Sequence, residues 1–186
     1  MILTLVQLGV YTAGRFLARV AALGFEDVVR QLVTRYGANP NDCDNNGNLP
    51  IVAAAWEGHL GCVRALVELG ADVNAAGDDG KKPLHRAVDG GNADCVRLLV
   101  ELGADLACAD SHGATPLHRA AVHGDVNLVR LLVDLGADVD CVDDYGREPR
   151  HRAMRCGHTQ CVRVLTALVQ RKRRRLASLG DSCQLQ

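Results

Sequence analysis

The clearest hydrophobic pattern lies in residues 110–142, where apolar side chains recur at helical spacing. Val129, Leu132 and Val133 fall on one face of a predicted helix about three turns long. Gly136 follows the last apolar position, and glycine is the residue that most readily adopts the left-handed conformation that ends a helix. The pattern therefore predicts a short amphipathic helix that buries one face and stops at this glycine.

A second helix is predicted just before it. Pro116 suits the first turn of a helix, where its missing N–H would have no partner in any case, and Thr115 can cap that turn. Gly124 ends this helix, and the helix described above starts from about Asp125. The polar stretch that separates one such pair from the next predicts an extended, hairpin-like loop.

The same arrangement recurs along the chain with a fixed period. Three ladders of glycine or proline repeat every 33 residues, which accounts for four of the five prolines and predicts a repeat architecture. The rungs are Gly47, Gly80, Gly113 and Gly146, then Pro50, Pro83, Pro116 and Pro149, then Gly37, Gly70, Gly103 and Gly136.

Short motifs repeat in register with the ladders. Thr-Pro-Leu-His-Arg-Ala at 115–120 returns as Lys-Pro-Leu-His-Arg-Ala at 82–87 and, more altered, as Glu-Pro-Arg-His-Arg-Ala at 148–153. Gly-Ala-Asp occurs at 70–72, 103–105 and 136–138. With its 33-residue period, this pattern resembles the ankyrin-repeat family. The resemblance extends from about residue 11 to 170. It implies an all-α solenoid of stacked helix-turn-helix units with hairpin loops, in which each unit is stable only against its neighbours.

The ladders divide the chain into seven segments. We expect an N-terminal apolar cap or partial repeat at 1–10, a degenerate repeat at 11–43, repeats at 44–76, 77–109 and 110–142, a C-terminal capping repeat at 143–170, and a basic, disordered tail at 171–186. The stretch 2–9 resembles 96–103, the end of a second helix. Two interpretations stay open: an apolar capping helix, or a start inside an earlier repeat of a larger enzyme or channel.

Composition fits this picture. Hydrophobic residues make up 48% of the chain, charged residues 23% and aromatic residues 3%, which suits a folded core of small aliphatic side chains. The longest uncharged apolar stretch, residues 1–14, is shorter than the roughly 17–25 residues that span a membrane. The net charge is −1, but residues 171–175 carry +5, so the remainder carries −6.

Eight cysteines raise the question of disulfides or zinc. Cys62, Cys95 and Cys161 share one repeat position, and Leu128 takes it in the fourth unit, so we interpret them as small core residues. Equivalent positions in stacked helices lie about 8–10 Å apart, too far for a disulfide. The cysteines thus favour a reducing compartment. The paired C-x₂-C spacing of structural zinc sites is absent, and we expect no metal or cofactor.

Catalytic chemistry is not predicted. His85, His118 and His151 share one position, and in the ankyrin family this histidine holds the turn before the first helix by hydrogen bonds to neighbouring backbone. No nucleophile or carboxylate partner recurs beside it. Gly80-Lys81-Lys82 lacks the upstream glycine and the Ser/Thr of a phosphate-binding loop. We therefore expect a non-enzyme with no small-molecule substrate.

The resemblance implies that partners meet the hairpin tips and the exposed, concave side of the first helices. We apply it to the repeat positions where the units differ most, because a core position would not accept such different residues. The predicted partner-binding residues are Asn46, Asn48, Trp56, Glu57, Asp79, Lys81, Asp89, His112, Val122, His123, Tyr145, Arg147 and Arg155. Trp56 shares its position with Asp89, Val122 and Arg155. A binding role and packing against a neighbouring helix both stay open for it.

Charge differs along this face. Asp78, Asp79 and Asp89 make the third unit acidic, whereas arginines at 147, 150, 152 and 155 make the last one basic. The basic run consists of Arg171, Lys172, Arg173, Arg174 and Arg175. It fits a nuclear-import signal, a site for nucleic acid or anionic lipid, or a solvated helix end.

Together these observations predict a monomeric adaptor, scaffold or inhibitor that binds another protein. Nucleic acid is the less favoured partner, because aromatic residues are not interleaved with the basic run. The expected location is the cytoplasm, extended to the nucleus if the run is an import signal.

Overall fold

The computed structural model describes residues 13–183, and all its regular elements within that range are α-helices. The expected segment at 1–10 lies outside the described residues, as do the last three residues of the chain. The helices pair as first and second helix of successive units: α2 Ala13–Ala22 with α3 Glu26–Thr34, α4 Pro50–Glu57 with α5 Leu60–Glu68, α6 Pro83–Asp89 with α7 Ala93–Glu101, α8 Pro116–His123 with α9 Val126–Asp134, and α10 Pro149–Arg155 with α11 Thr159–Cys183.

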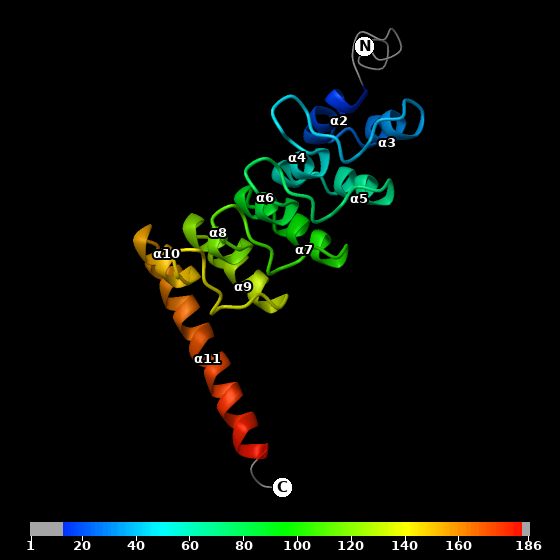
Figure 1. Cartoon of the computed structure of the whole chain (residues 1–186). Coiled ribbons are helices and arrows are strands. Elements are labelled where there is room, and N and C mark those ends of the chain that lie inside the picture. The colour runs from blue at the N-terminus through cyan, green and yellow to red at the C-terminus, as the bar shows by residue number, and fades with distance from the viewer. Residues whose placement is uncertain (1–12, 184–186) are drawn as a thin grey trace.

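The helices stack in two rows. The first helices α2, α4, α6, α8 and α10 contact one another in chain order, and the second helices from α3 to α11 form the neighbouring row (Figure 1). Each unit thus touches mainly the units before and after it, as a solenoid requires. The all-α solenoid expected from the sequence is confirmed. Among the described residues, no helix is both long and apolar enough to cross a membrane.

The core is a ladder of equivalent leucines. Leu66, Leu99, Leu132 and Leu165 occupy one repeat position on the second helices, and each is fully buried. Burying a leucine side chain contributes about 1.5–3 kcal/mol. In the first helices, Ile51, Leu84 and Leu117 are buried at another position, which Arg150 takes in the last unit. The row of buried apolar side chains at this position therefore stops before the last unit.

The predicted helix ends are confirmed. Pro116 is the first residue of α8, and Gly124 caps its end in the left-handed conformation. Gly136 follows α9 with φ +110°.

The cysteines predicted to lie in the core do so: Cys62, Cys95 and Cys161 are each at most 1% exposed.

The basic tail differs from the expectation. We expected disorder from residue 171, but α11 continues through the basic run to Cys183. The second helices of the other units are nine residues long, whereas α11 has 25. Val169 stands where the other units carry the terminating glycine, and Lys, Arg, Leu and Ala favour helix. The helix therefore runs on beyond the stack (Figure 1).

Candidate binding surface

Hydrogen bonds between units hold the hairpin tips in place. The Nε2 atom of His85 lies 2.9 Å from the carbonyl oxygen of Ala114, and that of His118 lies 2.8 Å from the carbonyl oxygen of Arg147. Because Nε2 donates to these carbonyls, Nδ1 is the acceptor, and it receives the backbone N–H of Lys82 or Thr115 at 3.2 Å. The structural role implied for this histidine position is confirmed at these two residues.

These imidazoles are held in their neutral form. Burial lowers the pKa of both His85 and His118, and it outweighs the carbonyl hydrogen bonds, which act in the opposite direction. His151 repeats the turn contact, since its Nδ1 accepts the backbone N–H of Glu148 at 3.2 Å. The three histidines therefore fix the loops that carry the tip residues.

A second set of contacts ties three of the units to the preceding first helix. His59 Nε2 lies 3.0 Å from the carbonyl oxygen of Ala22, and His158 Nε2 lies 2.9 Å from that of Val122. Asn92 takes the equivalent position and donates to the carbonyl oxygen of Trp56 at 2.6 Å. The end of α4, which carries the tryptophan, is thus fixed from the next unit.

Trp56 stands beside a hollow of about 220 Å³ on the row of first helices. Its side chain is 41% exposed, and the Arg86 guanidinium lies 5.0 Å from its ring centroid. Asn48, Val52 and Glu57 complete the hollow together with Ala22 and Ala53. Three of the predicted residues, Asn48, Trp56 and Glu57, are therefore brought together. The ring keeps one part open to solvent, while a cation stacks on it.

An adjoining hollow of about 150 Å³ lies at the tips of the second and third units. It shares Asn48, Val52 and Arg86 with the first hollow and adds Asn46 and Asp79. Arg86 donates to Asp79 at 2.8 Å, so one guanidinium links the acidic tip to the tryptophan. The two hollows form a continuous surface, which we call the Trp56 groove.

The expectation that Asp89 faces solvent is wrong. Only 2% of its side chain is exposed, because Arg119 donates to both carboxylate oxygens at 2.7 Å and His123 Nε2 lies 2.9 Å away. Lys81 Nζ adds a contact at 3.6 Å. Burial by itself would raise the pKa of Asp89, but the hydrogen bonds from Arg119 and His123 outweigh it and lower this pKa. The predicted acidity of the third unit is largely neutralised.

Three of the four arginines that make the last unit basic are paired in a similar way. Asp143 is buried and accepts hydrogen bonds from Arg147 at 3.0 Å and from Arg152 at 2.7 Å. Burial alone would raise its pKa, yet the backbone N–H of Arg147 and the Arg152 side chain hold the pKa far below its usual range. Arg150 pairs with Glu148 at 2.5 Å.

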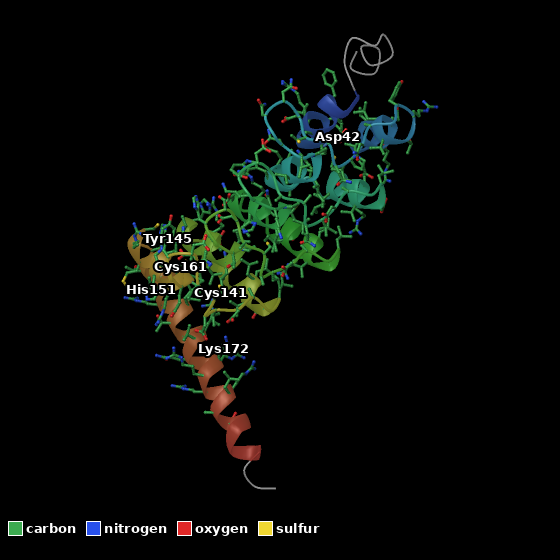
Figure 2. All side chains as sticks on the ribbon, in the orientation of Figure 1. Asp42, Cys141, Tyr145, His151, Cys161 and Lys172 are labelled. Carbon is green, nitrogen blue, oxygen red and sulfur yellow. The ribbon has the colours of Figure 1, made fainter. Side chains whose placement is uncertain are left out.

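Tyr145 is the other exposed aromatic among the predicted residues. It is 66% exposed, and the Arg147 guanidinium lies 4.3 Å from its ring centroid. Figure 2 places Tyr145 with His151 and Cys161 at the last unit, whereas Asp42 lies near the opposite end of the stack. Tyr145 is thus well separated along the stack from the Trp56 groove.

Of the other predicted residues, His112 and Arg155 are exposed and Val122 is half-buried.

Sequence reasoning missed Arg86 and Arg119. They share a repeat position with Ala53 and Arg152, and each contacts a residue thirty positions earlier in the preceding unit, Trp56 or Asp89. This position holds alanine in one unit and arginine in the other three, so it varies less than the chosen positions, and a criterion based on variability missed it.

The basic run lies along the exposed part of α11. Arg171, Arg173, Arg174 and Arg175 are exposed, whereas Lys172 turns toward the preceding hairpin and pairs with Asp138 and Asp140. Figure 2 shows Lys172 on the helix where it leaves the stack. The cytoplasmic and nuclear locations inferred from the cysteines and this run stay predictions.

Comparison with known proteins identifies the architecture. A comparison with curated proteins gives no match. The family model described as ankyrin repeats, in three copies, matches residues 17–110 and 102–173. Ankyrin repeats generally serve as protein–protein interaction modules and are typically non-catalytic. The matched segments cover most of the chain and coincide with its stacked helix pairs, and the chain therefore belongs to the ankyrin-repeat family.

Proposed function

We propose that the chain is a non-catalytic adaptor, scaffold or inhibitor that binds a partner protein over its first helices and hairpin tips, with the Trp56 groove as the principal contact. The observation that carries this proposal is an exposed tryptophan beside a hollow of about 220 Å³. Tryptophan, tyrosine and arginine dominate the binding energy of protein interfaces. Trp56 and Arg86 supply two of these at one place, already oriented by their stacking contact.

The side chains around the groove favour a protein partner that offers both an apolar and a basic side chain. Glu57 is exposed and Asp79 remains partly open, with 44% of its side chain accessible. Val52 and the tryptophan ring contribute apolar surface. A segment that inserts an apolar side chain next to the ring and presents a basic group to Glu57 would match the site, since Asp79 already pairs with Arg86 and Lys81. Such rim charges act mainly on association rate and register.

Affinity capture followed by mass spectrometry tests the proposal. The wild-type chain, Trp56→Ala, Tyr145→Ala and the double variant would be compared, and affinities for the captured partner measured by calorimetry. We expect Trp56→Ala to weaken binding about tenfold or more, as for a central interface aromatic. Tyr145→Ala should have a smaller effect if the partner extends to the last unit.

Phe25→Ala is the matched control. Phe25 is an exposed aromatic, 53% accessible, that lines neither hollow of the groove. Its truncation should leave the affinity unchanged, and circular dichroism should give equal helix content for all variants. Capture that is equally strong with and without Trp56 would show that the partner binds elsewhere.

A further inference from the structure

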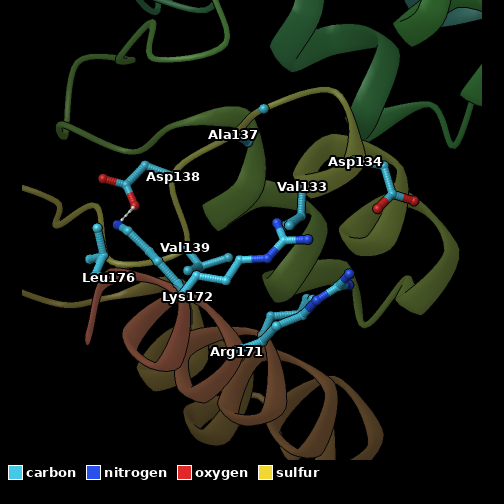
Figure 3. A pocket seen from close by; sticks show the side chains of 11 residues that line it. Val133, Asp134, Ala137, Asp138, Val139, Arg171, Lys172 and Leu176 are labelled. Carbon is cyan, nitrogen blue, oxygen red and sulfur yellow. Dashed lines mark hydrogen bonds and ion pairs between the residues drawn. The ribbon is translucent and has the colours of Figure 1, made fainter. Parts of the chain in front are cut away.

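The extended part of α11 forms a groove that the sequence did not predict. A hollow of about 650 Å³ lies between this helix and the end of α9 with its following hairpin. Its volume falls within the range of about 300–1,000 Å³ that ligand-binding clefts occupy. Figure 3 shows Arg171, Lys172 and Leu176 of α11 facing Val133 and Val139 across it. We call this hollow the α11 groove.

The groove has an apolar floor. Val139 is buried, Val133 and Leu168 are half-buried, and Leu176 is 60% exposed at the outer end. Leu176 lies on the part of α11 that extends past the stack, so packing of the repeats does not bury its side chain. It would be covered by an apolar side chain that entered the groove.

Basic side chains line one wall of the groove. Some of them form ion pairs with carboxylates of the chain, and others do not. Lys172 Nζ lies 2.5 Å from Asp138 and 3.1 Å from Asp140, which fixes α11 against the hairpin. Arg171 and Arg175 lie one helical turn apart and also line an adjoining hollow of about 410 Å³ with Arg174. Among the side chains that the structure describes, which end at Ser178, no ion pair includes any of these three arginines.

We propose that the α11 groove binds an acidic, amphipathic peptide segment of a partner protein. Apolar side chains of the segment would cover Leu176 and Val139, and carboxylates one turn apart would pair with Arg171 and Arg175. Guanidinium groups form the strongest carboxylate pairs, often through two parallel hydrogen bonds. An apolar floor distinguishes this site from a surface for polyphosphates, which offer no apolar side chain to cover it.

Fluorescence anisotropy of a synthetic peptide tests the proposal. The probe is a fluorescein-labelled helix-forming peptide with leucine on one face and glutamate at every fourth position beside it. A second peptide carries glutamine in place of each glutamate. We expect the full chain to bind the glutamate peptide at least about tenfold more tightly than the glutamine peptide. Added salt should weaken binding of the acidic peptide.

Paired variants separate the groove from general charge. Arg171→Gln/Arg175→Gln should weaken binding of the glutamate peptide about tenfold. The control Arg163→Gln/Arg173→Gln removes the same charge from exposed positions of the same helix that line neither hollow. It should change the affinity less than about twofold. Leu176→Ser should also weaken binding, which a purely electrostatic attraction would not predict.

Several outcomes would overturn the proposal. They are absence of binding to the glutamate peptide, equal losses in the two arginine pairs, and no effect of Leu176→Ser. Tighter, groove-dependent binding of a single-stranded oligonucleotide or of phosphatidylserine vesicles would assign the site to nucleic acid or membrane instead. Trp56→Ala should leave peptide binding unchanged, so this result stands apart from the test of the Trp56 groove.

Discussion

The guanidinium of Arg119 donates to both carboxylate oxygens of Asp89, each at 2.7 Å, and so joins α8 to the end of α6. His123 adds a third contact to the same carboxylate from the end of α8. The carboxylate is thus shielded by side chains of the following unit, with 2% of the Asp89 side chain left exposed. A residue that is exposed within its own unit becomes part of an interface when the next unit stacks on it.

Removing the arginine of this pair should destabilise the stack. Arg119→Ala leaves a buried carboxylate with only His123 and the more distant Lys81, so we expect the free energy of unfolding to fall by about 2–3 kcal/mol. Urea unfolding followed by circular dichroism measures this loss. Arg130→Ala, an exposed arginine on α9, is the control and should change stability by less than about 0.5 kcal/mol. Similar losses for both would show that the ion pair contributes nothing.

Asparagines at one repeat position bond to the backbone of the next unit, and the alanine at this position in a later repeat can be replaced by asparagine. Asn41 bonds to the carbonyl of Gly70 at 2.9 Å and to the N–H of Asp72 at 2.8 Å, and Asn74 bonds to the equivalent groups of the next unit. Ala107 takes the same position one repeat later and is exposed. We expect Ala107→Asn to raise the free energy of unfolding by about 1 kcal/mol through these two bonds.

The aspartate variant provides the control for that prediction. Ala107→Asp supplies an acceptor for a backbone N–H but has no N–H to donate to a carbonyl oxygen. It should therefore stabilise the chain less than Ala107→Asn. Equal unfolding midpoints for the two variants would mean that the bond to the carbonyl is not formed.

The glycine after α7 should not tolerate a branched side chain. Gly103 has φ +95°, and a Cβ placed on it would meet no other atom within 4 Å, so any penalty comes from the backbone alone. Gly103→Val should lower the free energy of unfolding by at least about 1 kcal/mol. Gly103→Asn should be milder, because asparagine adopts the left-handed region more readily. Thermal unfolding of the three chains decides the matter, and equal melting temperatures would contradict the prediction.

Stability should decrease as the solution becomes mildly acidic. Burial lowers the pKa of His85 and His118 below the ordinary value of 6.5, so the unfolded chain binds more protons than the folded chain once the pH falls below that value. The stabilisation is complete above about pH 6.5 and is lost below it, by up to about 1.4 kcal/mol per pH unit for each imidazole that remains neutral.

Urea unfolding at several pH values between about 7.5 and 5.5 measures this slope. His118→Gln should reduce the slope, even though it also destabilises the chain at neutral pH. A free energy of unfolding that stays constant over this range would show that the histidines do not titrate with folding.

Much of the fold could be predicted because it depends on local chemistry. Pro116 begins its helix and Gly124 ends its helix through the conformations that these residues permit in any context. Cys62 and Cys95 could be assigned to the core because their repeat position holds only cysteine or leucine. The site was predicted less completely. Asn48, Trp56 and Glu57 do meet, but Asp89 could not be distinguished by variability from an exposed acid.

By itself, the sequence determined the repeat, the helix pairs and the leucine ladder, because a 33-residue period imposes the same backbone turns and apolar faces on each unit. Only the tertiary structure decided which charges remain open. Arg86 lies over Trp56 and Arg119 binds Asp89 because stacking places residues thirty positions apart side by side. The α11 groove likewise exists only because the helix continues past the stack while Lys172 holds it against Asp138.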